Sequence, residues 1–386
     1  MMRPRTGLII AVTVVVAAAL IGIRLLRSKV HAHKHDKVTG DASFDVAADG
    51  QRIHLLILKQ HGDHQALLHK RIENGGESAE TELPRAANEK IISKRSNDVR
   101  VAAHANHVVA LWQVAGTGFM NRGPLRFAES LDGGTSWKAI AGPTAANRTD
   151  DQGFAGFTAD AQGKFHLVWL DLEAKVKGLR YAAFAGGKWS AVETIDAATC
   201  QCCWNSIAVS AGGEPVVMYR ALKPRDMATA RRRRDGWVKE GSVDNFGWQI
   251  EACPHAGGGL ALGKKSAFAV TWTGHEKEQG TYFAATNGAG KWERKMRLGG
   301  KFARNPDIAR TADRLAAVWD EFEGERRMVK VRISPDGGNE WRQEEILTDT
   351  QVSGSYPRVV ALPQGFTVFW SETQKGGTAG VRYKKI

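Results

Sequence analysis

The 386-residue chain contains 42% hydrophobic residues, 42 glycines and 12 tryptophans, a composition that excludes a disordered or collagen-like protein. Its formal net charge of +13 favours anionic partners such as acidic glycans, phospholipid head groups or nucleic acid. Because no zinc-finger, RNA-binding or helix-turn-helix signature accompanies the charge, nucleic acid is an unfavoured partner.

An uncharged apolar run, residues 7–23, follows a basic N-terminus at residues 1–6. Its length is close to the minimum for a helix that crosses a bilayer. The nearest small-residue cleavage site, at residues 30–32, lies behind a basic stretch. The sequence therefore favours an uncleaved membrane anchor over a cleaved signal peptide.

A basic, histidine-rich linker at residues 24–42 contains His31, His33 and His35 in an alternating tract. Such a tract suits Cu(II), Ni(II) or Zn(II), and it equally suits a flexible polar linker beside a membrane. The densest basic cluster, at residues 231–234, is interpreted as a solvated surface, because a charge run on a loop needs no ligand.

Seven thirteen-residue stretches share a small or apolar start, a polar middle and an alternating apolar finish that ends on a large residue. They occupy residues 45–57, 100–112, 157–169, 207–219, 260–272, 307–319 and 358–370. Each stretch has the form of two short strands joined by a tight turn. A second pair of strands lies between them and is clearest at residues 124–140 and 329–347. Two such hairpins make a four-stranded blade.

A repeat near 50 residues built from four strands predicts an all-β fold, a β-propeller that spans residues 43–386. We expect seven blades, with six as the alternative, because the final copy ends one strand short. A segment near Val38 is expected to supply that missing outer strand and close the ring.

Two segments, SLDGGTSW at residues 130–137 and SPDGGNEW at residues 334–341, fit the pattern S-x-D-x-G-x-x-W. They resemble the Asp boxes of sialidase-like, BNR-repeat propellers, and degenerate versions occur at residues 186–189, 234–237 and 288–292. The physical role of the box is structural: Asp caps the turn, Gly takes positive φ and Trp packs between blades. The boxes are therefore poor catalytic candidates.

The resemblance implies an active site in which three arginines bind a carboxylate on the top face of the propeller. Candidates are Arg100 and Arg358, which begin their stretches, together with Arg304 and Arg220 beside two others. The early Arg-Ile-Pro motif of sialidases is absent from this chain, which argues against sialidase activity.

The resemblance also implies a tyrosine nucleophile with a carboxylate partner. Tyr356 is the nucleophile candidate, with Glu251, Asp226 or Asp244 as its possible carboxylate partners. A chain with 54 basic residues places some arginines near a pore by chance, so a binding or structural role is favoured over hydrolysis.

All four cysteines lie in two segments, one with Cys200, Cys202 and Cys203 before Trp204, the other with Trp248, Cys253 and His255. This pairing resembles a subgroup of sialidase-like bacterial proteins with C-x-C-C and W-x-I-x-x-C-P segments. Two disulfides in an oxidising compartment are the favoured interpretation. A copper or zinc site formed by the cysteines with His255 is the alternative, and free or redox-active thiols are a third.

These features favour a membrane-anchored protein with its propeller outside the cytoplasm, in the periplasm, or a secreted protein if the N-terminal segment is cleaved. We expect it to bind a glycan, a peptide or an envelope protein on its top face without hydrolysis, using Trp204, Trp248 and Arg220. A glycoside hydrolase of the exo-sialidase type and a metal-handling protein are the alternatives.

Overall fold

The computed structural model describes residues 40–173, 177–373 and 379–386. The predicted anchor, the basic N-terminus and the three linker histidines lie outside these residues. Within the described ranges, no helix is long and apolar enough to span a membrane. The described chain consists of strands and their connecting loops, with one short 3-10 turn, η1 (Phe119–Asn121).

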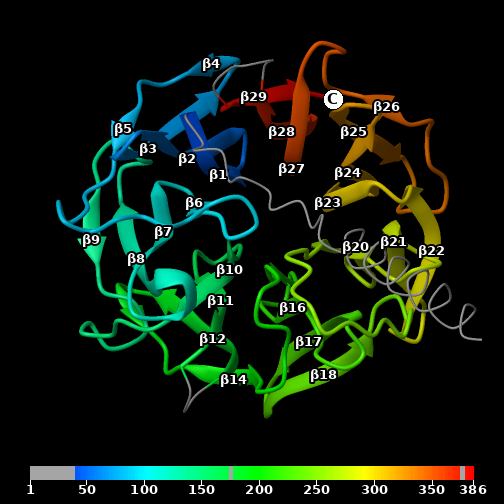
Figure 1. Cartoon of the computed structure of the whole chain (residues 1–386), viewed down its shortest axis with the longest axis horizontal. Helices are drawn as coiled ribbons and strands as arrows, with labels where there is room; N and C mark the ends of the chain where they lie inside the picture. The colour runs from blue at the N-terminus through cyan, green and yellow to red at the C-terminus, as the bar shows by residue number, and fades with distance from the viewer. Residues whose placement is uncertain (1–39, 174–176, 374–378) are drawn as a thin grey trace, which may run out of the picture. The chain divides into compact units, whose positions relative to one another are not determined.

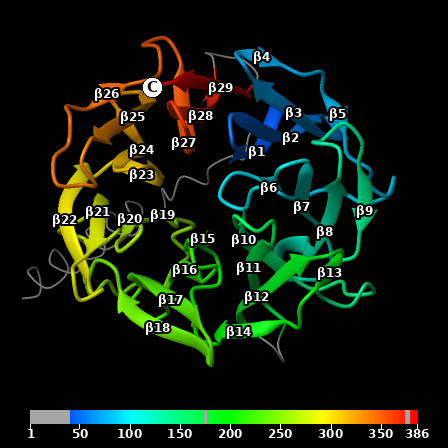
Figure 2. The ribbon, with the colours of Figure 1, turned by 180° about the vertical axis from the view of Figure 1, so that it is seen from behind.

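The strands form seven blades around a ring (Figures 1 and 2). Blade one contains β1 (Gly40–Asp49), β2 (Arg52–His61) and β3 (His64–Glu73), with β4 (Gly76–Glu77) and β5 (Thr81–Glu82) both paired to β3. Blade two contains β6 (Arg100–His104), β7 (His107–Ala115), β8 (Arg122–Ser130) and β9 (Lys138–Ile140). Blade three contains β10 (Gln152–Ala159), β11 (Phe165–Asp171) and β12 (Gly178–Ala185), with β13 (Lys188–Trp189) and β14 (Glu193–Asp196) paired to β12.

The second half of the chain repeats this arrangement. Blade four contains β15 (Ser206–Val209), β16 (Pro215–Arg220), β17 (Met227–Arg233) and β18 (Gly236–Ser242). Blade five contains β19 (Gly259–Leu262), β20 (Ala267–Thr273), β21 (Gly280–Thr286) and β22 (Trp292–Gly299). Blade six contains β23 (Ala303–Thr311), β24 (Arg314–Glu323), β25 (Arg326–Ser334) and β26 (Glu345–Ile346), and blade seven contains β27 (Ser353–Leu362), β28 (Gly365–Thr373) and β29 (Ala379–Lys385).

The last blade closes onto the first. β29 pairs with β28 and also, at Ala379, in parallel with Gly40 of β1, so both blades belong to one continuous sheet. The prediction of seven blades is therefore confirmed over the six-bladed alternative. Val38 itself lies outside the described residues, and Gly40 is the residue that contacts the edge of β29.

Because neighbouring strands in a blade run antiparallel, the connecting loops divide between two faces. The top face carries the segments that enter each first strand and the loops between second and third strands, and it faces the viewer in Figure 1. The bottom face carries the turns between first and second strands and the loops between third and fourth strands. The seven predicted stretches are the paired first and second strands of the seven blades.

Large side chains that end these stretches form the layers between blades. Six of them are 4% exposed or less: Trp112, Trp169, Tyr219, Trp272, Trp319 and Trp370. The alternation of each second strand explains this burial, because every other side chain points to the same side of its sheet. Removing a buried aromatic side chain of this size costs about 3–5 kcal/mol of stability.

Two loops on the bottom face, residues 130–137 and 334–341, share one hydrogen-bond pattern. In the first, Ser130 Oγ accepts the Gly134 N–H at 2.7 Å and Asp132 Oδ1 accepts the Ser136 N–H at 2.8 Å. The second loop repeats both bonds at the same distances with Ser334, Gly338, Asp336 and Glu340. Both aspartates thus bind within their own loops.

Candidate functional site

The central cavity of the ring, about 140 Å3 in volume, is lined by the first residue of every predicted stretch. In blade order these are Asp45, Arg100, Phe157, Ile207, Leu260, Asp307 and Arg358. Three neighbouring blades therefore supply apolar side chains, and the other four supply charged ones. The starts of the seven innermost strands therefore surround the pore.

The charged half of the pore is a network of compensated ion pairs. Arg100 Nη1 lies 3.4 Å from Asp45 Oδ1, and Arg358 Nη2 lies 3.6 Å from Asp98 Oδ2. Arg95, which precedes the second blade, lies 2.8 Å from the other oxygen of Asp98. The network therefore contains three arginines and three carboxylates, the third carboxylate being that of Asp307. The network therefore has no surplus positive charge for a substrate carboxylate.

Tyr356 borders this network, because the Arg95 guanidinium lies 4.9 Å from the centroid of the Tyr356 ring. The Arg304 guanidinium covers the Trp272 ring at 4.8 Å from its centroid. Tyr356 is held by its backbone, because its N–H donates to Asp320 Oδ2 at 2.7 Å and its carbonyl accepts from Arg95 at 3.0 Å. Burial raises the pKa of the Tyr356 hydroxyl above its ordinary value, which disfavours the phenolate that a nucleophile requires.

The three carboxylate candidates lie in different environments. Glu251 is exposed, with Lys223 Nζ 3.8 Å away. Asp226 is buried and accepts backbone N–H bonds from Gly247 at 2.7 Å and Trp248 at 3.1 Å. Asp244 is buried without a side-chain hydrogen bond, and burial together with neighbouring Asp226 raises its pKa to about 7. Among the described hydrogen bonds and ion pairs, none joins Tyr356 to any of them.

Trp204 and Trp248, the predicted aromatic contacts for a ligand, are only 3% and 5% exposed. They pack with Trp272 and Ala256 in a hydrophobic cluster under the top face. Arg220 is also buried and donates to the Ala256, Arg225 and Trp272 carbonyl oxygens at 3.2, 2.6 and 2.8 Å. These side chains support the fold, and a sugar ring could not stack on them without displacing neighbours.

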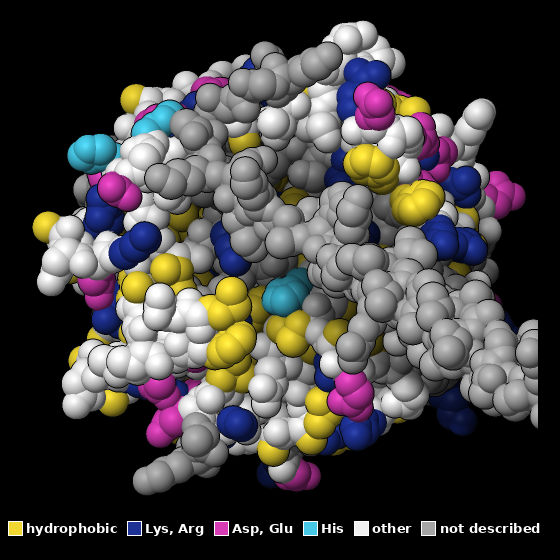
Figure 3. Space-filling view, viewed as in Figure 1, with side chains coloured by type: hydrophobic (Ala, Val, Ile, Leu, Met, Phe, Trp, Pro, Cys, Tyr) yellow, Lys and Arg dark blue, Asp and Glu magenta, His cyan; other side chains and the backbone are white. Residues whose placement is uncertain are grey.

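Other hydrophobic side chains are accessible on this face. Phe119 and Met120, in the loop between β7 and β8, are 75% and 69% exposed. Figure 3 shows hydrophobic side chains gathered beside a histidine near the middle of the top face. His255 is exposed, and its ring centroid lies 6.4 Å from that of Phe154.

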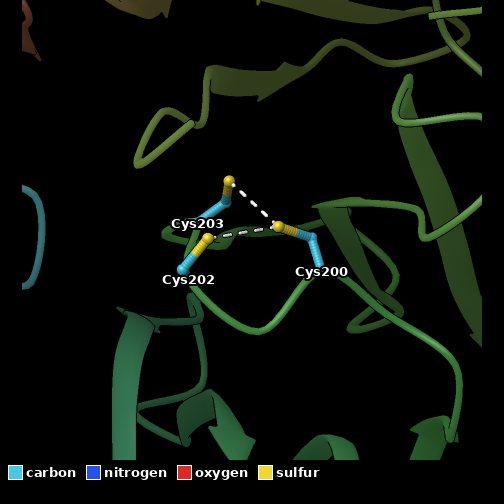
Figure 4. Close-up of side chains that lie close together, drawn as sticks. All are labelled: Cys200, Cys202 and Cys203. Atoms are coloured by element: carbon cyan, nitrogen blue, oxygen red, sulfur yellow. Dashed lines mark hydrogen bonds between the residues drawn. The ribbon is translucent and has the colours of Figure 1, made fainter. Parts of the chain in front are cut away.

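Three of the four cysteines form a buried cluster just before β15 (Figure 4). Cys200 Sγ lies 3.5 Å from Cys202 Sγ and 3.4 Å from Cys203 Sγ. These separations exceed the roughly 2.05 Å of a disulfide bond, and all four cysteines are free, so the favoured disulfides do not occur in the structure. Cys253 is exposed, and neither it nor His255 belongs to the cluster, because their loop carries them to the surface.

The cluster favours a thiolate at Cys200. Hydrogen bonds from the Cys202 and Cys203 thiols lower the pKa of Cys200, while the same contacts help to raise the pKa of Cys202. Burial raises the pKa of Cys203. Arg225 Nη1 donates to Cys200 Sγ at 3.2 Å, and a guanidinium at that distance stabilises a negative sulfur.

A large cavity lies on the bottom face. It has a volume of about 930 Å3 and is lined by loops of blades five and six, including Lys264, Lys265, Arg310 and Trp341. A second cavity of about 610 Å3 between blades four and five shares the turn at residues 263–266 with the first. We name the two together the basic groove.

Charge in the basic groove is only partly compensated. Arg231 pairs with Glu240 at 2.6 Å and Arg233 with Glu214 at 3.1 Å. Lys264, Lys265 and Arg310, by contrast, form no ion pair within the described residues, and both lysines are exposed. The predicted solvated cluster at residues 231–234 thus forms ion pairs. The unpaired cations lie elsewhere, Lys264 and Lys265 in the turn after β19 and Arg310 in β23.

No protein-family model and no curated protein matches the chain. Among solved structures, a polysaccharide lyase described as a PL25 ulvan lyase matches with a TM-score of 0.60 and 10% identity, over 90% of this chain and 93% of the lyase. The polysaccharide lyase Uly1 matches with a TM-score of 0.54 and 11% identity, over 94% of each chain. A Trypanosoma rangeli sialidase has a TM-score of 0.49 and 10% identity, over 77% of this chain and 55% of its own. The fold is a seven-bladed β-propeller of the kind found in the two lyases.

Proposed function

We propose that this propeller binds an acidic polysaccharide in the basic groove of its bottom face, without cleaving it. The observation that carries the proposal is the set of three cations, Lys264, Lys265 and Arg310, that form no ion pair among the described residues. They line one large cavity and outnumber the carboxylates of its lining, Asp313 and Asp336. The two lyases of similar fold are named for action on polysaccharides, which supports a glycan ligand.

The size of its cavity favours the basic groove over the pore as the binding site for a polysaccharide. Ligand sites in proteins commonly measure about 300–1,000 Å3. The groove cavity of about 930 Å3 lies in that range, whereas the pore cavity of about 140 Å3 lies below it. The half-buried indole of Trp341 adds an aromatic surface beside the cations.

Hydrolysis is not part of the proposal, because Tyr356 lacks the features of an activated nucleophile. Its hydroxyl contacts none of the candidate carboxylates, and its pKa is raised rather than lowered. We also propose that residues 7–23 place the propeller outside the cytoplasm, where polysaccharides of an envelope are accessible.

Affinity measurements on the full chain with heparin and polygalacturonate, and with neutral dextran as a control, test this function. Replacing Lys264, Lys265 and Arg310 together by Ala should weaken binding of the acidic polymers about 10- to 100-fold, because each exposed charge contributes about 0.5–1 kcal/mol. The matched control is Lys277→Ala with Lys301→Ala, which removes exposed charge from the top face and should change affinity less than twofold.

Two results contradict the proposal. Equal weakening by both sets of substitutions would mean that net charge alone attracts the polymers. Turnover of an aryl sialoside that is lost in Tyr356→Phe would show that the chain is a hydrolase.

A further inference from the structure

We propose that Cys200, Cys202 and Cys203 form a three-coordinate thiolate site for Cu(I) beneath the top face. This site is separate from the basic groove, since it lies at the entry to blade four and shares no residue with the groove. The three sulfur atoms lie within 4.8 Å of one another, and two of the separations are 3.4 and 3.5 Å.

The geometry needs little change to hold an ion. With metal–sulfur bonds of about 2.3 Å, a planar set of three sulfurs lies about 4 Å apart. The cluster would therefore open by roughly 0.5 Å around Cys200, a movement within reach of χ1 adjustments in a short loop. The loop itself is anchored, because the Cys200 N–H donates to the Arg220 carbonyl at 3.0 Å.

The number of ligands favours Cu(I) over Zn(II). Structural zinc takes four ligands, commonly thiolate or imidazole, whereas soft thiolates select Cu(I). Within the part of the chain that the structure describes, no fourth Cys, His, Asp or Glu joins the three sulfurs. Cys253 is exposed on another loop, and His255 Nδ1 donates to the Cys253 carbonyl oxygen instead, at 3.0 Å.

Charge balance also favours a monovalent ion. Three thiolates and one Cu(I) carry a net charge of −2, and Arg220 and Arg225 supply two positive charges nearby. Arg225 Nη1 lies 3.2 Å from Cys200 Sγ, and the buried Arg220 guanidinium interacts electrostatically with both Cys200 and Cys203. A buried anionic centre requires such compensation.

Burial protects the site from water. The three cysteines are 2%, 4% and 1% exposed and pack against Phe154 and Tyr219 in one hydrophobic cluster. A thiol must lose its proton to bind copper, so each sulfur–copper bond that forms at a thiol releases a proton to solvent. Affinity should therefore increase with pH.

The test is a titration of reduced full-length protein with Cu(I) under anaerobic conditions, in competition with bathocuproine disulfonate. We expect one Cu(I) per chain and an X-ray absorption spectrum with three sulfur neighbours and no nitrogen. Cys202→Ser and Cys203→Ser should each lower the affinity for Cu(I) at least 100-fold. Cys253→Ser and His255→Ala, which alter residues outside the cluster, should leave retention unchanged.

Thermal unfolding of each copper-free variant identifies those that fail to fold, and Cys200→Ser and Arg225→Gln provide further variants for that case. Loss of retention in Cys253→Ser or His255→Ala equal to that in Cys202→Ser would overturn the assignment of ligands. Mass spectrometry of protein purified without reductant gives a second test. A disulfide within the cluster, together with no Cu(I) binding after that disulfide is reduced, would also overturn the proposal. The Lys264, Lys265 and Arg310 triple variant should bind Cu(I) normally, which separates this test from that of polysaccharide binding.

Discussion

The Arg220 guanidinium lies 5.3 Å from the ring centroid of Trp248, with both side chains buried under the top face. The same guanidinium lies 5.9 Å from the Trp272 ring and donates to three backbone carbonyl groups. Arg220 thus joins the end of β16, the second strand of blade four, to the long segment that enters blade five. This contact explains why residues that suggest ligand binding in the sequence are structural in the fold.

Arg220→Ala should therefore destabilise the propeller by at least about 3 kcal/mol, because it leaves buried carbonyl groups without a donor and creates a cavity. Urea unfolding measures the loss. Arg234→Ala, at an exposed position of the neighbouring basic cluster, is the matched control and should stay within about 0.5 kcal/mol of the parent. Similar stability of the two variants would contradict the structural role of Arg220.

A buried histidine pair makes stability depend on pH. His54 Nδ1 lies 3.0 Å from His69 Nε2, and burial is the main cause that lowers the pKa of His54 to about 4 and of His69 to about 3. The unfolded chain binds protons at these imidazoles below about pH 6.5, whereas the folded chain does not until about pH 4. The free energy of unfolding should therefore decrease as pH falls through this window, by at least about 2 kcal/mol between pH 6.5 and 4.5.

Denaturant unfolding at several pH values measures how steeply the free energy of unfolding changes with pH. The double variant His54→Leu and His69→Leu should make this slope smaller, whatever the effect of the substitutions on stability at neutral pH. The control, His61→Ala with His64→Ala, removes two exposed imidazoles and should keep the parental slope. An unchanged slope in the buried double variant would exclude the pair as its source.

Replacing Asp244 or Asp226 by Asn should change the stability of the protein in opposite directions. The raised pKa of Asp244, about 7, means that the folded state favours the protonated acid, so stability decreases as pH rises from about 4 through about 7. Asp244→Asn should therefore stabilise the protein by about 1–2 kcal/mol at pH 8 and have little effect at pH 5. Asp226→Asn weakens two backbone hydrogen bonds and should destabilise by about 1–3 kcal/mol at both pH values.

Melting temperatures of both variants at pH 5 and pH 8 test this pair. Stabilisation by Asp244→Asn that is equal at the two pH values would show that packing, not ionisation, is responsible.

Removal of residues 379–386 tests ring closure. The deletion takes away β29, the partner of β28, and exposes an unpaired strand edge that favours association between chains. We expect a lower melting temperature and higher oligomers in size-exclusion chromatography. Lys384→Ala, which removes only a partly exposed ion pair with Glu345, should remain like the parent. A monomeric, stable deletion variant would mean that six complete blades hold the ring.

The sequence predicted the blades well because each depends on local alternation and turn residues. Arg100 and Arg358, which were singled out because they begin their stretches, line the pore. Sequence could not show that carboxylates neutralise these arginines, since Asp45 and Asp98 meet Arg358 only when the first and last blades come together. The missed Arg95 precedes a first strand without belonging to any repeated stretch.

Two other features depended on packing between blades. Burial of Trp204 and Trp248 follows from the path of a long connection, which has no periodic pattern. The spacing C-x-C-C suggested bonded sulfurs, but the direction of each side chain in the loop determined that Cys200, Cys202 and Cys203 gather while Cys253 does not.

The contact between Gly40 and Ala379 also has a consequence for biosynthesis. Chains emerge from the ribosome N-terminus first, and domains form as their segments appear. Here one edge of the opening strand waits for a partner that is translated more than 300 residues later. Until β29 has been synthesised, that edge of β1 stays unpaired, so we expect chaperone binding there to matter most before blade seven is complete.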